Sequence, residues 1–312
     1  VIMQNIKFYD INSSISTGNT YGSAIATPMN YNASNISLTV SECFFYDCSA
    51  DGYGGAVNIM DGFTASFNNC YFGQNTAGLN SSGGGAIFFG DYNPNSGSGI
   101  LNITNCNIYG NYSNNVYSGG LLTYTSNNYE VIYINIKNSF FAYNTNNDVD
   151  SYTNDSYIVW DIDQSIIRDS SELSDGATNG SEAADDLDTF TNNNTGAGFD
   201  YDDLAIGFDD DKRFKWLTTA GSSSTLTENG TSSPTSIDIN GVPRPQGTSA
   251  DIGAFEYTNT WLGTNGSNDF HEANNWTLSQ VPGSSSAYNA VWIEDGTTDP
   301  VITEDVELSV MK

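Results

Sequence analysis

Apolar and polar residues alternate with a period of two through roughly the first 170 residues, in short runs separated by Gly, Asn and Ser. The runs are rich in Ile, Phe, Tyr and Val, a composition typical of β-strands rather than helices. The clearest run occupies residues 67–75 and reads Phe-Asn-Asn-Cys-Tyr-Phe-Gly-Gln-Asn. It is followed by Gly84-Gly85-Ala86-Ile87. The pattern predicts short strands joined by tight turns.

This run recurs along the chain. Related runs begin at Val40, Ile103 and Ile136, and more degenerate ones begin at Met3 and Ile162. Aligning the copies gives one column, which is Ile6, Cys43, Cys70, Cys106, Ser139 and Ser165. The Gly-Gly element recurs as Gly54-Gly55-Ala56-Val57 and Gly119-Gly120-Leu121-Leu122, which we align pair for pair with Gly84-Gly85-Ala86-Ile87.

The spacing between copies is irregular, although the pattern within each copy is kept. This is typical of a solenoid whose insertions are confined to turns. The sequence therefore predicts an all-β fold, a right-handed parallel β-helix of about six coils. Stacked coils place equivalent residues about 4.8 Å apart. Cys43, Cys70 and Cys106 should then form an inward ladder, and Asn75, Asn111 and Asn144 a turn ladder whose amides hydrogen-bond from coil to coil.

The repeated Phe-x-x-Asn and Gly-Gly-Ala-(Ile/Val/Leu) elements resemble the repeats of polymorphic outer-membrane proteins and related bacterial surface β-helices. Residues 238–256, with Asp238, Arg244 and the run Asp-Ile-Gly-Ala-Phe-Glu at 251–256, are similar to the closing segment of secreted bacterial β-helices of the choice-of-anchor type. Trp261-Leu262-Gly263, Asn275-Trp276 and Val281-Pro282 resemble the opening of a further surface module. These resemblances imply a fold more specifically than a function.

We therefore expect β-helix coils in residues 1–170, an acidic loop and capping segment in 171–257, and the start of another β-rich module in 258–312. The capping segment would cover apolar rungs and unpaired strand edges. Within it, Arg244 is expected to form a structural ion pair, with Asp238, Asp251 and Glu256 as its candidate partners.

The chain carries 37 acidic and 8 basic residues, a formal net charge of −29 and a pI near 4.1. Such a charge disfavours nucleic acid, anionic membranes and polyanionic glycans as partners. No apolar run is long enough to span a membrane, and the N-terminus lacks the features of a signal peptide. Because the chain begins within a coil, we expect it to be a piece of a longer polypeptide. Its composition favours an extracellular location on a bacterial cell surface.

Asp10 and Asp47 occupy one column of neighbouring coils. Two carboxylates about 5 Å apart fit a retaining glycosidase, or they could share a calcium ion. The alternative is that both face solvent in a turn.

Two other kinds of chemistry are uronate elimination and calcium binding by the acidic stretch 171–211. Uronate elimination by a polysaccharide lyase is disfavoured, because residues 1–170 contain only Lys7, Lys137 and Arg168 as cations and no His. The acidic stretch 171–211 contains the calcium candidates Asp202, Asp203, Asp209 and Asp211. Its spacing matches neither an EF-hand nor the glycine-rich nonapeptide repeat, so a solvated charged face is the favoured interpretation and calcium the alternative. No other cofactor is expected.

The four cysteines, Cys43, Cys48, Cys70 and Cys106, are expected to be buried free thiols. A Cys43–Cys48 or cross-coil disulfide remains open. Trp261 and Trp276 are either sugar-stacking platforms or core residues of a β-module, and the core is favoured.

Taken together, these features favour a structural or adhesive segment of a large secreted surface protein. It would attach to surface glycans, to neighbouring cells or to copies of itself. The alternatives are a carbohydrate-active β-helix hydrolase using the Asp pair, and a filament-forming subunit. An enzyme is the less favoured of these.

Overall fold

The computed structural model describes residues 1–13, 21–28, 36–78, 83–91, 97–114, 117–125, 131–152, 157–163, 165–167, 205–208, 214–217, 236–245, 250–256, 259–261, 268–276, 281, 291–292 and 300–301. The chain divides into two compact units, residues 1–197 and 198–312.

The first unit consists of four parallel sheets. Sheet A contains, in order, β1 (Ile2–Gln4), β5 (Ser37–Ser41), β9 (Thr64–Asn68), β13 (Ile100–Thr104), β17 (Ile132–Lys137) and β20 (Ile158–Asp163). Sheet B contains β2 (Lys7–Tyr9), β6 (Phe44–Tyr46), β10 (Tyr71–Gly73), β14 (Asn107–Tyr109), β18 (Phe140–Ala142) and β21 (Ile166–Ile167). Sheet C contains β3 (Asn12–Ser13), β7 (Ser49–Ala50), β11 (Thr76–Ala77) and β15 (Tyr112–Ser113). Sheet D contains β4 (Ile25–Ala26), β8 (Val57–Met60), β12 (Ile87–Asp91), β16 (Leu121–Thr125) and β19 (Val149–Ser151).

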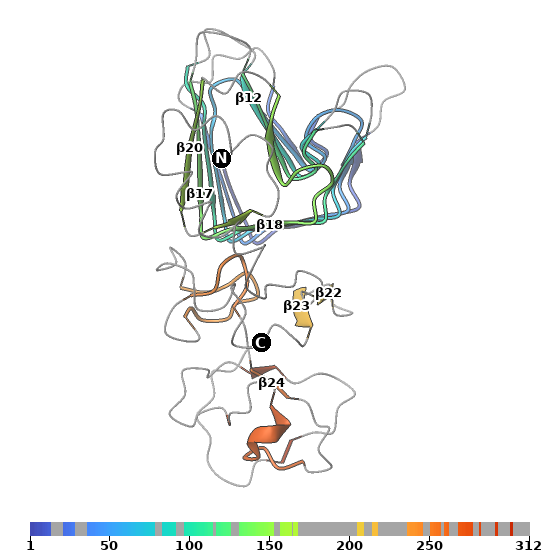
Figure 1. Ribbon diagram of the computed structural model, residues 1–312, viewed down its shortest axis with the longest axis vertical. Coiled ribbons are helices and arrows are strands. Elements are labelled where there is room, and N and C mark those ends of the chain that lie inside the picture. Colours follow the sequence, from blue (N-terminus) through green and yellow to red (C-terminus); the bar gives the residue numbers. More distant parts are fainter. Residues whose placement is uncertain are drawn as a thin grey trace, which may run out of the picture. The chain divides into compact units, whose positions relative to one another are not determined.

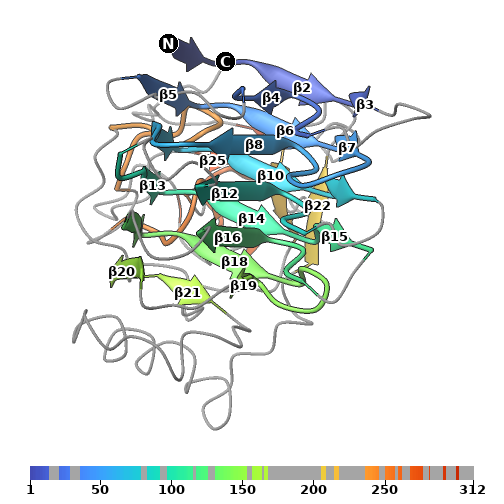
Figure 2. The ribbon, with the colours of Figure 1, turned by 90° about the horizontal axis from the view of Figure 1, so that it is seen from above.

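In the first four circuits the chain visits sheets A, B, C and D in turn and then returns to sheet A beside its previous strand. We call each circuit a coil. The fifth coil passes from β18 of sheet B to β19 of sheet D without a described strand in sheet C. In the first unit Figure 1 looks along the stack, so strands of one sheet lie behind one another, and Figure 2 shows successive coils side by side. All-β structure with parallel strand ladders is confirmed, and the arrangement is consistent with a β-helix solenoid.

The core lies between the inward faces of these sheets. In sheet A, Val40 pairs in register with Phe67, which pairs with Ile103. All three are fully buried, and the residues on either side of each are less buried, so the predicted period of two is confirmed. In sheet B, the rings of Phe8, Phe45 and Phe72 stack with centroids 4.8 and 4.6 Å apart. Each such pair adds about 1 kcal/mol beyond simple burial.

The turns explain the Asn, Asp and Gly residues that separate the strands. Five residues that follow the sheet A strands have φ between 48° and 56°, and they are Asn5, Glu42, Asn69, Asn105 and Asn138. Five residues that follow the sheet B strands have φ between 51° and 64°, and they are Asp10, Asp47, Gln74, Gly110 and Tyr143. This left-handed conformation favours Gly, Asn and Asp. It turns the chain at the same two corners in successive coils.

The predicted cysteine ladder is confirmed. The backbone N–H of Cys70 donates to Cys106 Sγ (3.4 Å), and that of Cys106 donates to Ser139 Oγ (3.1 Å). The column ends as expected, with the N–H of Ser139 donating to Ser165 Oγ (3.1 Å). All four cysteines are free and buried, which settles the open question of a disulfide. Burial raises the pKa of the Cys70 thiol well above its ordinary value, so the reactive thiolate is disfavoured.

We expect iodoacetamide to modify none of the four thiols in the native protein and all four after denaturation in guanidinium chloride, counted by intact-protein mass spectrometry. The variant Asn114→Cys places a thiol at an exposed position and provides the positive control. Rapid modification of Cys43 or Cys70 under native conditions would contradict the buried ladder.

The asparagine ladder is also confirmed. Asn75 Nδ2 donates to Asn111 Oδ1, and Asn111 Nδ2 donates to Asn144 Oδ1, both at 2.8 Å. The same two oxygens accept the backbone N–H of the preceding rung at 3.0 Å. The ladder ends on Asp148, whose buried Oδ1 accepts from the side chain of Asn144 at 2.8 Å. Each amide thereby satisfies buried backbone groups that would otherwise cost about 1–3 kcal/mol apiece.

Asn111→Ala should lower the free energy of unfolding by about 3 kcal/mol or more, because several buried donors and acceptors lose their partner at once. Chemical denaturation followed by circular dichroism measures this. Asn114→Ala, an exposed asparagine three residues further on, should change the denaturation midpoint little. Equal effects of the two substitutions would show that the ladder is not stabilising.

One element of the predicted alignment is wrong by one residue. Ile87 pairs with Leu121, not Leu122, so Gly119 lies over Gly85 and Gly120 over Ala86. The physical reason is steric. A Cβ at Gly85 would meet the backbone oxygens of Gly119 and Tyr112, so this position requires glycine in successive coils, whereas the position before it accepts Ser118 in place of Gly84.

The second unit contains two small sheets. β22 (Ala205–Phe208) pairs antiparallel with β23 (Phe214–Leu217), and β24 (Asn259–Thr260) pairs parallel with β25 (Val291–Trp292). A 3₁₀ helix spans Ala273–Asn275. Among the residues described in both units, no helix combines the length and apolar character needed to cross a membrane.

The two tryptophans form the centre of a small core in this unit. Trp261 and Trp276 are each only 1% exposed and pack edge to face with centroids 5.1 Å apart. Trp276 also packs on Phe270, and its Nε1–H donates to the Phe270 carbonyl (2.9 Å). Their role as core residues is confirmed, since buried rings offer no face to a sugar.

Candidate functional site

Asp10 and Asp47 lie at the corner that follows sheet B in adjacent coils. Their preceding residues, Tyr9 and Tyr46, are paired in register. The backbone N–H of Asp10 donates to the Tyr46 carbonyl (3.2 Å), and both side chains are exposed to solvent. Both residues adopt the left-handed turn conformation that an aspartate tolerates well. The shared column is as expected, while a catalytic or cation-binding role for the pair stays a prediction.

The calcium candidates Asp202, Asp203, Asp209 and Asp211 lie outside the described residues. Within the part of the chain that is described, no three His, Cys, Asp or Glu side chains gather closely enough to hold a metal ion.

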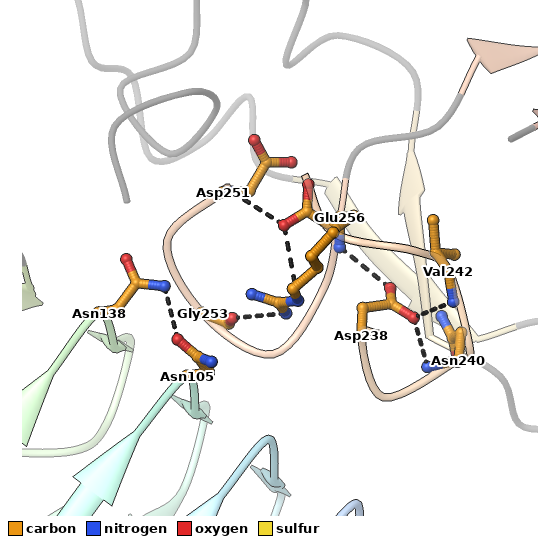
Figure 3. A network of polar contacts seen from close by, with 9 residues as sticks. Asn105, Asn138, Asp238, Asn240, Val242, Asp251, Gly253 and Glu256 are labelled. Atoms are coloured by element: carbon orange, nitrogen blue, oxygen red, sulfur yellow. Dashed lines mark hydrogen bonds and ion pairs between the residues drawn. The ribbon is translucent and has the colours of Figure 1, made fainter. Parts of the chain in front are cut away.

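A buried polar cluster joins the two ends of the segment 236–256 (Figure 3). Arg244 Nε lies 3.5 Å from Glu256 Oε1, and both side chains are 1% exposed. Arg244 also donates to the Gly253 carbonyl (2.9 Å), while the backbone N–H of Asp251 donates to Glu256 Oε1 (3.0 Å). Glu256 is thus confirmed as an ion-pair partner of Arg244, as the sequence predicted.

Asp238 holds the other side of this cluster through backbone groups. Its Oδ1 accepts from the N–H of Asn240 (2.8 Å) and of Val242 (2.7 Å), and its Oδ2 accepts from the N–H of Glu256 (3.0 Å). Burial raises the pKa of Asp238 from 3.8 to about 6, against the opposing effect of these hydrogen bonds and of Arg244. These bonds hold the turn at 238–242 against the segment 254–256, so we interpret the cluster as structural.

Because folding raises the pKa of Asp238, the folded segment binds the proton more tightly than the unfolded chain does. The contribution of Asp238 to the free energy of unfolding should therefore be greatest below about pH 4. It should decline as the pH rises to about 6 and stay constant above that. Asp238→Asn removes this titration. Relative to this variant, the wild type should lose melting temperature as the pH rises from about 4 to about 7. A difference that is independent of pH would contradict the raised pKa.

A second surface feature is a set of aromatic side chains on the outward face of sheet D, which we call the aromatic strip. Its buried base is Met60, Phe88 and Leu122. Five partly exposed tyrosines lie on or beside this base, and they are Tyr21, Tyr53, Tyr117, Tyr124 and Tyr152.

The rings of the strip contact one another from coil to coil. Tyr21 and Tyr53 are parallel with centroids 6.2 Å apart, and Tyr53 lies 4.6 Å from Phe88. Tyr152 lies 4.7 Å from Tyr117 and 5.5 Å from Tyr124. The strip therefore extends from the first coil to the fifth.

Burial and the neighbouring Tyr152 raise the pKa of Tyr117 to about 12. Burial, followed by Tyr152, also raises the pKa of Tyr124. The phenol hydroxyls of these two residues are therefore neutral across the physiological range, and each keeps its proton as a hydrogen-bond donor.

The strip was not predicted from the sequence, although a signal for it is present. Tyr21, Tyr53, Gly83 and Tyr117 each lie four residues before Ile25, Val57, Ile87 and Leu121, which pair in register on sheet D, so they occupy one position of successive coils. This position immediately precedes the left-handed Gly22, Gly54 and Gly84. The sequence shows a tyrosine directly before this glycine position at Tyr21 and Tyr53. Because Gly119 was aligned one residue out of register, Tyr117 was assigned to a different position from these two tyrosines.

The comparisons with known proteins add nothing to this geometry. No protein-family model, no curated protein and no solved structure matches the chain.

Proposed function

We propose that this chain is a right-handed parallel β-helix that forms a structural and adhesive segment of a secreted bacterial cell-surface protein. The handedness follows from the general rule that crossovers between parallel strands of one sheet are right-handed. In this proposal, residues 236–256 cap the β-helix and the tryptophan core begins a further surface module.

The observation that carries the proposal is the register of the stack. Because the coils pair residue over residue, each outward column becomes a row of like-placed side chains. On sheet A, Asn135 Nδ2 donates to Asn102 Oδ1 (2.8 Å), and Asn102 Nδ2 donates to Ser66 Oγ (3.0 Å). On sheet D, the outward columns carry the aromatic strip. A stiff stack with such rows supports presentation of a binding surface, and exposed aromatic patches often mark interaction sites.

The acidic character of the chain fits this role. A net charge of −29 keeps copies of the protein soluble and apart, and it opposes binding to anionic polymers.

The test is deletion of residues 1–257 from the protein in its host. We expect attachment of the cells to a surface or to one another to fall several-fold, as counted by microscopy after washing. Deletion of residues 258–312 alone provides the matched control, because it leaves the coils and the 236–256 segment in place.

Surface labelling with an antibody must show that each truncated protein still reaches the outside of the cell. Unchanged attachment with the shortened protein present at the surface would refute an adhesive role.

A further inference from the structure

We propose that the aromatic strip binds an uncharged polysaccharide chain that runs along the direction in which the coils stack. This inference rests on the proposed adhesive function and names its ligand class.

The strip runs along the direction in which the coils stack. Tyr21 belongs to the first coil and Tyr152 follows the sheet D strand of the fifth. Four steps of about 4.8 Å make the strip about 19 Å long. Tyr21, Tyr53 and Tyr117 share one column along this length, each four residues before a residue of the in-register row Ile25, Val57, Ile87 and Leu121. A ligand that uses the whole strip must therefore be extended, as a polymer is.

The tyrosine rings of the strip have the chemistry to bind sugars. The face of an aromatic ring is electron-rich, and it attracts the partly positive C–H groups on the flat side of a pyranose ring. The tyrosine hydroxyls can hydrogen-bond to sugar hydroxyls at the same time. Phe88 and Leu122 are fully buried beneath the strip, so the exposed tyrosines are supported from below and are held in place.

The exposed area of the strip favours a glycan over a protein partner. None of the five tyrosines is more than 39% exposed, and a tyrosine side chain offers about 150–250 Å². The strip therefore presents less than about 500 Å². A stable protein interface needs about 800 Å² on each partner. The strip alone is too small for such an interface and has a suitable size for a single polysaccharide chain.

The charge in and around the strip favours an uncharged ligand. The charged residue in the columns of the strip is Asp150, which is 5% exposed. It accepts hydrogen bonds from Asn147 Nδ2 (3.3 Å) and from the N–H of Ser151 (2.8 Å). No Lys or Arg belongs to the described residues of the strip. A uronate or sulfated polymer would approach a carboxylate and a net charge of −29 without any neutralising cation. An uncharged chain meets no such repulsion.

Affinity electrophoresis of the full chain in native gels tests the proposal. The gels contain a neutral β-glucan, a galactomannan or a hydroxyethylcellulose, and parallel gels contain polygalacturonate or alginate. We expect at least one neutral polymer to retard the protein and neither anionic polymer to do so. Tyr53→Ala, Tyr117→Ala and Tyr152→Ala should each weaken the retardation roughly tenfold.

Two matched controls use tyrosines outside the strip. Tyr112 is 46% exposed and lies on sheet C, and Tyr133 is 40% exposed and lies on sheet A. Tyr112→Ala and Tyr133→Ala should bind like the wild type. Tyr53→Phe and Tyr117→Phe keep the ring and should retain most of the retardation, and circular dichroism shows whether each variant has kept its fold.

The proposal is overturned if no neutral polymer retards the protein, if only anionic polymers do, or if the alanine variants of the strip bind like the controls. These failures differ from failure of the adhesive role. Cells that carry the strip variants and still attach would refute the strip as the ligand site, whereas only the 1–257 deletion tests the adhesive segment itself.

Discussion

Parallel pairing of each coil with the next, residue over residue, is the constraint on which the rest of this structure depends. It brings equivalent side chains about 4.8 Å apart in every column. A residue in the interior must therefore be compatible with its own kind above and below. Stacked rings satisfy this condition at Phe45 and Phe72, and so do amides at Asn75 and Asn111, because an amide both donates and accepts. A buried column of like charges would not satisfy it, and the ladder places its carboxylate, Asp148, only at the end.

The same constraint explains how much of the fold could be predicted from the sequence. The columns of Cys43 and Asn75 were predictable, because an interior position that tolerates few residue types repeats them. The register at Gly119 was not, because two adjacent glycine positions have different causes. One is left-handed at Gly54 and Gly84 but takes an ordinary backbone at Ser118, so it does not require glycine in every coil, whereas the other needs the absence of a Cβ. Residue identity alone cannot separate these two requirements. Counting back from Leu121, the residue that pairs with Ile87, would have separated them.

The candidate site was less predictable, for a related reason. Outward columns face solvent in the first approximation, so nothing requires like residues to repeat there. The tyrosine column is interrupted at Gly83, where a Cβ would meet Leu122 and Tyr117. The continuity of the strip is restored by Phe88, which comes from a different column and packs on Tyr53. A surface assembled from two columns leaves only a partial repeat in the sequence.

The relation between interior and exterior also bears on how such a chain can acquire a function. Once hydrogen-bonded ladders and stacked rings fix the interior, substitution of an outward residue costs little, because surface changes away from such features alter stability by about 0.5 kcal/mol or less. Sheet A has become a polar row through Ser66 and Asn102, and sheet D an aromatic one through Tyr53 and Phe88. The two faces thus carry different side chains on the same supporting coil. The binding properties of this chain are therefore better sought in its outward columns, one face at a time, than in the repeat that defines its fold.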